Sequence, residues 1–168
     1  MGETAHCRKL LSKYCQGTGL DIGFGGDSIS STAINLDLET PYTSVGNDPQ
    51  HLKGNCKNLY WFKNEALDYV YSSHLLEDFG AEEMKQIIKE WFRVLKIDGN
   101  FVLYCPDEQV YRSMTAEHIR NKAHVIAHFS LKFFKERILA NIKEICYDVV
   151  YENAHVGSYS FAIVLRKK

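Results

Sequence analysis

The sequence lacks any long hydrophobic run. No stretch approaches the roughly 20 apolar residues that a membrane-spanning helix needs, and residues 1–16 lack the apolar core of a secretory signal peptide. There is also no excess of charge of one sign, because the net charge is -1 and the pI is about 6.6. We therefore expect a cytoplasmic protein with no membrane span and no nucleic-acid partner.

The chain also lacks paired cysteines. It has five cysteines, an odd number, and no two of them have C-x-x-C spacing. Cys105 and Cys146 lie in apolar runs with the pattern of strands, where a free thiol behaves as a small hydrophobic group. This usage predicts a reducing compartment, with neither disulfides nor structural zinc.

Internal repeats and low-complexity segments are absent too, so the 168 residues are expected to form one domain with a sizeable core. Acidic residues prevail in residues 1–84 and basic residues in residues 85–168. One interpretation is a basic substrate side that takes an acidic acceptor. The basic residues are scattered, however, which favours two differently solvated faces.

The apolar pattern that is present predicts alternating strands and helices. Strands are expected at residues 19–24, 33–37, 51–54, 67–73, 101–105, 143–151 and 158–166, and helices at 4–15, 81–95 and 130–142, the last with Ser130 as N-cap. Helices between strands in the first two thirds of the chain imply a parallel sheet. The short turn region between the last two strands implies an antiparallel hairpin.

Residues 19–26 are the most informative stretch. Leu20 and Ile22 alternate with Asp21 as in a short buried strand, which then runs into three glycines within four residues. Glycine lets a ligand approach the backbone closely. A strand that breaks into glycines near the start of an α/β chain is typical of a nucleotide-binding loop.

The connection after these glycines is short. Six residues separate Gly26 from Ala33, too few for a typical helix of about 11 residues, so the first crossover is predicted to be a loop or a single turn. This disfavours an NAD-binding fold, which needs that helix and an acidic residue about 20 positions downstream. Asp37 lies only 14 residues after Gly23.

The sequence Asp-Ile-Gly-Phe-Gly-Gly at residues 21–26 resembles the D-x-G-x-G-x-G motif of class I S-adenosylmethionine (SAM) methyltransferases. The resemblance implies that SAM is the cofactor and that its methionine half is wrapped by the glycines, which are Gly23, Gly25 and Gly26. It also implies that Asp21 helps to hold the cofactor's amino group. Asp27 replaces the last glycine of the motif and would place an acid near the SAM carboxylate.

Two further segments concern the nucleoside half of the cofactor. Asp37 ends the second predicted strand, where a carboxylate can accept both ribose hydroxyls; Glu39, two residues on, is the alternative. Residues 54–59 resemble the family's G-D-A/C-x-x-L segment. The resemblance implies that Asn55 accepts from the adenine amino group and that the backbone N–H of Cys56 donates to the ring.

Residues 67–79 resemble the strand-and-turn segment fDhVhSsHvLEHf of UbiE-like methyltransferases, the methyltransferase type 11 group. The resemblance implies that Ser72 and Ser73 face the methionine portion of SAM. His74 is then a candidate catalytic base near the methyl group, and the alternative is a histidine that only packs and caps.

The segment from Cys105 to Phe129 resembles uncharacterised methyltransferases linked to surface-sugar biosynthesis. In that resemblance Tyr111, His124 and His128 line the acceptor pocket. His124 and His128 are four residues apart and could share a helix face, and with His118 they could bind zinc. Solvated or packed histidines are the favoured interpretation, so no metal site is expected.

Together these features predict a single class I SAM-dependent methyltransferase domain. Its fold would be a Rossmann-like, mostly parallel sheet of at most seven strands, with helices on both faces and a C-terminal antiparallel hairpin. Residues 1–16 would form an N-terminal helix or cap, 17–107 the cofactor-binding half, and 108–168 the acceptor side. The expected reaction moves a methyl group from SAM to a small molecule, such as a sugar.

Two alternatives remain beside this interpretation. The first is a methyltransferase-like module that binds SAM or S-adenosylhomocysteine (SAH) without catalysis. Asp27, Asn55 and the missing first crossover helix favour it. The second is a short NAD-dependent enzyme, which the spacing from the glycines to Asp37 disfavours.

Overall fold

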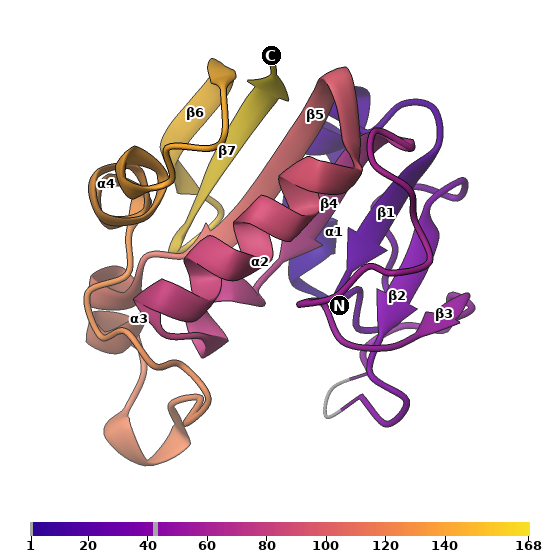
Figure 1. Cartoon of the computed structure of the whole chain (residues 1–168). Coiled ribbons are helices and arrows are strands. Elements are labelled where there is room, and N and C mark those ends of the chain that lie inside the picture. The colour runs from indigo at the N-terminus through magenta and orange to yellow at the C-terminus, as the bar shows by residue number, and fades with distance from the viewer. Residues whose placement is uncertain (1, 42–43) are drawn as a thin grey trace.

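A seven-stranded mixed sheet forms the centre of the computed structural model, which describes residues 2–41 and 44–168 (Figure 1). The strands follow the order β3-β2-β1-β4-β5-β7-β6. They are β1 (Gly19–Ile22), β2 (Ile34–Asp37), β3 (Leu52–Lys53), β4 (Leu67–Ser73), β5 (Leu95–Pro106), β6 (Tyr147–Val156) and β7 (Ser160–Lys167). The first five strands pair in parallel, and β7 pairs antiparallel with both β5 and β6. The predicted fold class, including the closing hairpin, is confirmed.

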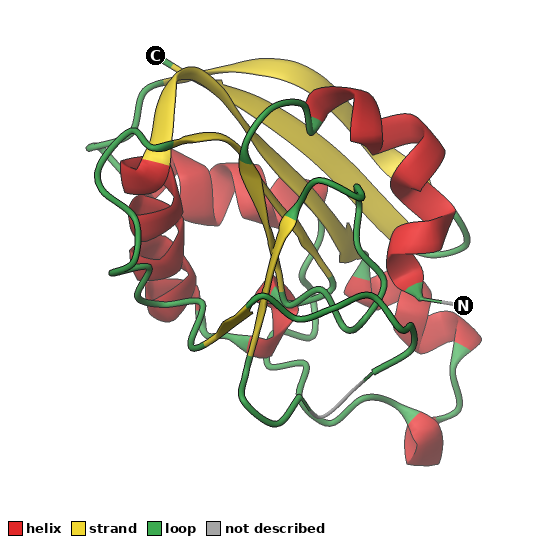
Figure 2. Ribbon diagram, turned by 90° about the vertical axis from the view of Figure 1, so that its right-hand side faces the viewer, coloured by secondary structure: helices red, strands yellow, loops and turns green. Residues whose placement is uncertain are grey.

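Helices lie on both sides of the twisted sheet, as Figure 2 shows. They are α1 (Glu3–Leu11), α2 (Ala81–Val94), α3 (Glu108–Met114) and α4 (Leu131–Phe133), and the helical path of α4 continues as tighter and wider turns to Asn141. Ser130 caps α4, because its side chain accepts from the Phe133 N–H at 3.2 Å. No helix within residues 2–41 and 44–168 is long and apolar enough to span a membrane.

Two apolar cores lie on opposite faces of the sheet. The larger core joins α2, through residues such as Ile87 and Trp91, to the strands and to the helical run after Ser130. The smaller core joins α1, through Cys7 and Leu11, to the other face. Strands that are buried on both faces read as nearly continuous apolar runs, which explains the composition of β7.

The segment between β1 and β2 contains no helix, as the six-residue gap predicted. A second loop supports it instead. The N–H of Val45 donates to the carbonyl of Gly25 at 2.8 Å, and the N–H of Asp48 donates to the carbonyl of Gly26 at 3.0 Å. Backbone hydrogen bonds from residues 44–48 therefore hold the glycine loop where a crossover helix would otherwise follow it.

Two predicted strands begin at other residues than expected, and one helix was not predicted. β5 already begins at Leu95, because residues 96–99 form an irregularity within the strand and not a turn before it; Asp98 has φ +63° there. β6 begins at Tyr147, since residues 143–146 are turn or irregular chain. The sequence analysis also missed α3, whose seven residues are too few to show a clear helical period, although Asp107 caps it by accepting from two backbone N–H groups.

Candidate functional site

Two adjoining cavities open beyond the carboxyl ends of β1, β2 and β4, with volumes of about 320 and 270 Å³. We call the first the β2-side cavity. It is lined by Gly23, Leu36, Asp37, Leu38, Pro41, Gly54, Asn55, Cys56, Lys57, His74, Leu75, Asp78, Phe79 and Ala123. We call the second the α3-side cavity. It is lined by Gly2, Glu3, Thr4, Gly23, Phe24, Gly25, Asp27, Val45, Ser73, His74, Glu77, Tyr111, Asn121, His124 and Tyr159.

Gly23 and His74 line both cavities and so mark their junction. This junction lies beside the boundary between β1 and β4, where the strand order of the sheet reverses. In open α/β sheets, ligands bind in the crevice outside the carboxyl ends of the strands at such a point. The two cavities thus occupy the position at which this architecture binds its ligands.

The glycine loop forms the floor of the junction. Gly23, Gly25 and Gly26 all have positive φ values, of +68°, +57° and +83°. A Cβ atom on Gly26 would lie 2.7 Å from the carbonyl oxygen of Gly46, which is backbone and cannot turn aside. Gly23 lines both cavities and Gly25 the α3-side cavity, whereas Gly26 lines neither. At Gly26 the conformation of the loop itself requires glycine.

Asp37 presents a carboxylate to the β2-side cavity from the end of β2. Its Oδ2 accepts from the Gly25 N–H at 3.1 Å and its Oδ1 from the Leu38 N–H at 2.8 Å, which fixes the side chain beside the glycine loop. The alternative, Glu39, does not line either cavity. It is exposed and lies 4.0 Å from the ammonium of Lys53.

Asn55 and Cys56 line the same cavity on its other side. The Asn55 Oδ1 accepts from the Lys57 N–H at 2.9 Å, and the Cys56 carbonyl accepts from the indole of Trp91 at 2.8 Å. Burial raises the pKa of the Cys56 thiol to about 12, so this thiol stays uncharged. Two carboxylates (Asp37 and Asp78), the amide of Asn55, the ammonium of Lys57 and several apolar side chains line this cavity. An apolar pocket with a few polar groups suits a nucleoside.

Asp21 and Ser72 line neither cavity. Asp21 is fully buried, and Leu20 and Ile22 belong to the larger core, so alternation along β1 places Asp21 on the side of α1. Its Oδ2 accepts from the Ile29 N–H at 2.7 Å, and burial raises its pKa to about 8. Ser72 donates to the carbonyl of Ile22 at 2.9 Å. Both side chains support the glycine loop from below.

Ser73 and His74 reach the cavities from the end of β4. The Ser73 hydroxyl is buried and has no hydrogen-bond partner among the described residues, so it is available to a ligand. His74 has φ +50°, and its Nε2 lies 3.1 Å from the hydroxyl of Ser160. Burial, followed by the nearby His124 and His6, lowers the pKa of His74 to about 3, which keeps its imidazole neutral.

Tyr111 and His124 both line the α3-side cavity, whereas His128 does not. His128 is exposed and packs edge-on against the ring of Phe133 at 4.9 Å. The prediction that His124 and His128 share a helix face is wrong, because residues 120–130 form no helix. Side-chain contacts shape this segment instead, such as the hydroxyl of Tyr111 accepting from the Asn121 N–H at 2.9 Å.

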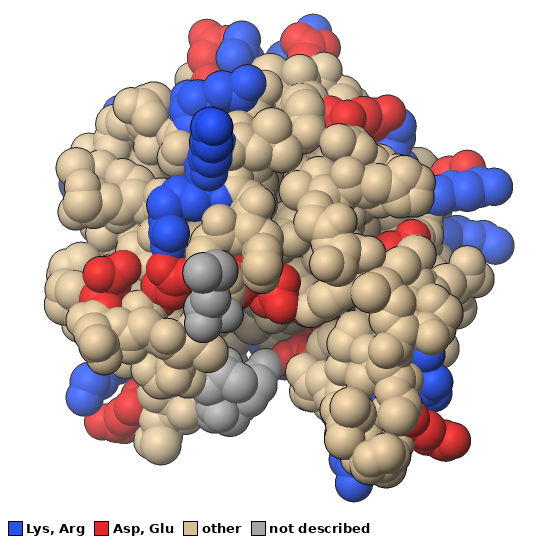
Figure 3. Space-filling view, turned by 180° about the vertical axis from the view of Figure 1, so that it is seen from behind, with Lys and Arg blue, Asp and Glu red and all other residues tan. Residues whose placement is uncertain are grey.

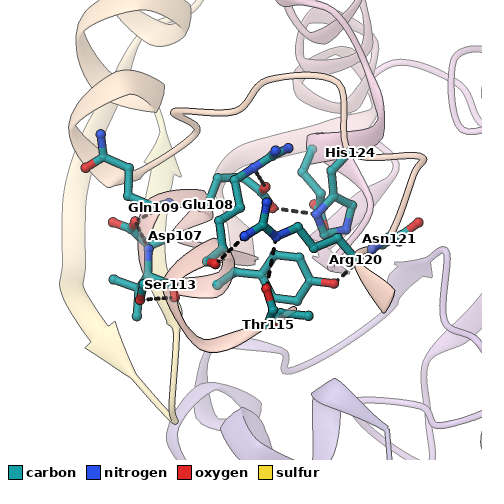
Figure 4. Close-up of polar contacts among 12 residues, drawn as sticks. Asp107, Glu108, Gln109, Ser113, Thr115, Arg120, Asn121 and His124 are labelled. Atoms are coloured by element: carbon teal, nitrogen blue, oxygen red, sulfur yellow. Dashed lines mark hydrogen bonds and ion pairs between the residues drawn. The ribbon is translucent and has the colours of Figure 1, made fainter. Parts of the chain in front are cut away.

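His124 forms a close pair with a buried glutamate (Figure 4). Its Nδ1 lies 2.5 Å from Oε1 of Glu108, and the other Glu108 oxygen accepts from the guanidinium of Arg112 at 2.8 Å. Burial alone would raise the pKa of Glu108, but the hydrogen bonds and charges of His124 and Arg112 outweigh it and lower this pKa. The pair therefore orients the imidazole with Nδ1 toward the carboxylate.

The sequence analysis missed four side chains of this site, namely Glu3, Glu77, Glu108 and Tyr159. The hydroxyl of Tyr159 donates to Oε1 of Glu3 at 2.6 Å, so the two ends of the chain meet in the cavity wall. No local pattern reveals such a contact. Glu77 lies within the motif at residues 67–79 and could have been singled out there.

The charge of the α3-side cavity is acidic. Glu3, Asp27 and Glu77 line it, and none of the described lining residues is Lys or Arg. Figure 3 shows Asp and Glu atoms along the walls of the hollow near the lower centre of that view. The interpretation of a basic substrate side for an acidic acceptor therefore finds no support at this cavity.

Asp27 is paired with a residue that the sequence analysis did not consider. The guanidinium of Arg8, on α1, forms an ion pair with its carboxylate. Arg8 also donates to the carbonyl of Ser28 from Nε at 3.1 Å and from Nη2 at 2.9 Å. The negative charge that replaces the last glycine of the motif is therefore compensated within the protein.

Comparisons with known proteins agree with this geometry. The family described as "Methyltransferase domain" matches residues 1–103. No curated protein matches the chain. Three similar solved structures, all below 20% identity, share the fold. The PH0226 protein of Pyrococcus horikoshii OT3 has a TM-score of 0.71 at 18% identity, with 98% of this chain and 89% of that chain covered.

The other two structures are described as SAM-dependent methyltransferases. A SAM-dependent methyltransferase of Archaeoglobus fulgidus has a TM-score of 0.66 at 15% identity, with 99% of this chain and 95% of that chain covered. A SAM-dependent methyltransferase of Aquifex aeolicus has a TM-score of 0.60 at 13% identity, with 94% and 87% covered. At these identities the likeness concerns the fold.

Proposed function

Because the chain belongs to the methyltransferase domain family, we propose that it transfers a methyl group from SAM to a small-molecule acceptor held in the α3-side cavity. One observation supports the proposal most. Gly23 of the glycine loop, Asp37 and Asn55 converge on a single cavity from three separate strand ends. This set suits a nucleoside attached to a charged chain, which is the chemistry of SAM, the cofactor of this family.

The residues that are present fit the cofactor. In our proposal Asp37 accepts from the ribose hydroxyls, and Asn55 and Cys56 meet the adenine. Gly23, Gly25 and the free hydroxyl of Ser73 face the methionine portion at the junction of the cavities. Asp21 and Ser72 would not contact the cofactor. They would act indirectly, by holding the backbone at Ile29 and Ile22, on either side of the glycine loop.

When bound, SAM supplies a methyl group activated by a sulfonium centre. The protein's contribution is then mainly to hold the acceptor in line and to exclude water, which can be worth about 7–11 kcal/mol. His74 lies where both cavities meet and remains our candidate for contact with the reacting groups. With a pKa of about 3 it would act there as a neutral hydrogen-bonding group.

Calorimetric titration of the purified protein with SAH tests this proposal. We expect one-to-one binding with micromolar affinity and no binding of NADH under the same conditions. Failure of the wild-type protein to bind SAH would contradict the proposed function. Binding of SAH together with no methyl transfer to any of a panel of sugars, amines and alcohols would favour the non-catalytic module instead.

The pairing of Arg8 with Asp27 gives a second prediction. Replacing Arg8 with Met is expected to weaken SAH binding about three- to tenfold, because the carboxylate of Asp27 would then face the carboxylate of the ligand without compensation. The double variant Arg8→Met with Asp27→Gly, which also restores the glycine of the motif, is expected to recover the wild-type affinity in the same titration.

Lys9 provides the matched control for this prediction. It is the exposed neighbour of Arg8 on α1, so Lys9→Met removes the same charge from the same helix without touching Asp27. We expect Lys9→Met to bind SAH like the wild type. Equal losses in Arg8→Met and Lys9→Met would mean that only the net charge of the helix matters and would contradict the local explanation.

A further inference from the structure

Glu77 is a buried acid that faces the α3-side cavity without a partner of normal hydrogen-bond geometry. Its side chain is fully buried and belongs to the lining, and the described residues offer its carboxyl oxygens only weak contacts, from its own N–H and from the Cys105 thiol. A buried carboxyl group is normally hydrogen-bonded, because leaving it unpaired costs free energy. The weakly paired oxygens therefore point to a donor that is bound in the cavity when the protein works.

Two histidines flank this acid at distances too long for hydrogen bonds. Oε1 of Glu77 lies 3.6 Å from Nδ1 of His74 and 3.9 Å from Nε2 of His124. His74 is held on its other side by Ser160, and its Nε2 is 3.5 Å from Glu3. No Lys or Arg among the described residues lines the α3-side cavity, and Glu77 therefore faces it without a cationic side chain of that kind.

The charges around Glu77 favour a cationic ligand. Glu3, on α1, contributes a second carboxylate, and Glu108, on α3, lies behind His124. Arg8 compensates the negative charge of Asp27, and Arg112 forms an ion pair with Glu108. Burial raises the pKa of Glu77 well above its usual range, and the charges of Asp78 and Glu108 add to this, against smaller opposing effects of the Glu77 N–H and the Cys105 thiol. A cation beside Glu77 would stabilise the charged carboxylate and so reduce the cost of burying it.

We propose that the acceptor of this enzyme is a small amine, and that Glu77 binds it as an ammonium group in the α3-side cavity. The aromatic rings of Tyr111 and Tyr159, 5.2 Å apart between centroids, would contact the cation and its alkyl part. This inference rests on the proposed function and narrows its acceptor from small molecules in general to one chemical class.

His124 provides the proton acceptor that an ammonium substrate requires. Its Nδ1 is bound to Glu108, so its Nε2 faces Glu77 and the cavity. One N–H proton of the ammonium passes to this Nε2, and the freed lone pair forms a bond to the methyl carbon. The bond from that carbon to sulfur breaks with its electron pair left on sulfur, which gives SAH, a methylated ammonium and an imidazolium beside Glu108.

Three probes of similar size test the class of ligand: n-butylamine, which is an ammonium ion at neutral pH, 1-butanol and butyrate. Each is titrated into ¹⁵N-labelled protein saturated with SAH and followed by NMR. We expect n-butylammonium to bind at least tenfold more tightly than the other two. We also expect it to shift the amide signals of Glu77, Tyr111 and His124. Equal binding of 1-butanol, or shifts elsewhere, would overturn the proposal without the need of any variant.

Glu77→Gln, which keeps the shape of the side chain, tests the assignment to this residue. Its affinity for n-butylammonium is expected to fall at least tenfold. Glu82→Gln, which changes an exposed glutamate on α2, is expected to bind the probe like the wild type. Unchanged binding in Glu77→Gln would refute the role of Glu77, and unchanged melting temperatures would show that both variants are folded.

SAH itself carries an ammonium group, so the ligand of Glu77 is either the cofactor or the acceptor. The variant Glu77→Gln distinguishes these two ligands. If Glu77 binds the acceptor, Glu77→Gln binds SAH with wild-type affinity, and the probe binds together with SAH. A loss of SAH affinity in Glu77→Gln, with the probe excluded by SAH, would assign the acid to the cofactor and overturn the inference. The binding of the three probes is also measured without SAH. Failure of the wild type to bind SAH would contradict the proposed function, while the probe measurements without SAH would still test the inference about the acceptor.

Discussion

Asp37→Ala is expected to weaken SAH binding by at least about 100-fold, which is the largest effect on cofactor affinity that we predict. Asp37 is the carboxylate that the end of β2 presents to the β2-side cavity, and a hydrogen bond to a charged group contributes about 1.5–3 kcal/mol. Loss of two such bonds to the ribose, about 3–6 kcal/mol, would exceed the roughly 2.8 kcal/mol that corresponds to a 100-fold change. Calorimetric titration with SAH measures the difference directly.

The stability of Asp37→Ala is expected to change little by comparison. Asp37 is only partly buried, and its two backbone partners, the N–H groups of Gly25 and Leu38, lie in loops that water can reach. We expect a fall of a few degrees in melting temperature, which corresponds to about 1 kcal/mol for a domain of this size. The loss of binding therefore should not reflect unfolding.

Two further variants separate the ribose contact from the support of the glycine loop. Asp37→Asn keeps one acceptor oxygen for the Gly25 N–H and is expected to fall between wild type and Asp37→Ala. Glu39→Ala removes the alternative acid, which is exposed and outside the cavity, and is expected to bind normally. Wild-type affinity in Asp37→Ala, or a loss in Glu39→Ala, would contradict the assignment.

The fold was predictable because its evidence is local. Each central strand is a short apolar run that ends at a glycine, proline or polar residue, and α2 shows a clear helical period. The missing crossover followed from counting residues between Gly26 and Ala33. The loop of residues 44–48 that holds the glycine loop instead was not predictable, because its backbone hydrogen bonds and the contact of Asp48 with the Ser28 N–H depend on tertiary packing.

The two cavities differ in how much of them the sequence revealed. The residues of the β2-side cavity follow strand ends, and parallel strands bring their ends to one edge of the sheet, so Asp37 and Asn55 could be placed from motifs. The α3-side cavity instead joins α1, the turn after β4, α3 and the β6–β7 turn. The contact of Glu3 with Tyr159 spans nearly the whole chain and depends on tertiary packing alone.

Asp21→Asn is expected to stabilise the protein at neutral pH, by an amount that grows with pH. Asp21 is fully buried, and burial raises its pKa from the ordinary value of 3.8 to about 8. Between these values the folded state keeps a proton that the unfolded state has released. The wild type therefore loses about 1.4 kcal/mol of stability per pH unit through this group as the pH rises from about 4 to about 8.

At pH 7 this penalty amounts to about 4 kcal/mol, and an asparagine does not incur it. The new amide N–H₂ would replace Oδ1, which has no partner among the described residues, and an unsatisfied buried group costs about 1–3 kcal/mol. The bond from the Ile29 N–H survives, because the amide oxygen can accept it. We therefore expect a net gain of roughly 2 kcal/mol in the free energy of unfolding by urea.

The dependence on pH is the decisive part of this prediction. The difference between Asp21→Asn and wild type should increase between pH 5 and 8 and level off above pH 8, whereas the exposed Asp98, changed to Asn, should give a difference near zero throughout. A constant difference for Asp21→Asn would mean that the acid is not protonated in the fold. An acid retained at such a cost under the glycine loop is best explained by function. We accordingly expect the more stable variant to bind SAH more weakly than the wild type.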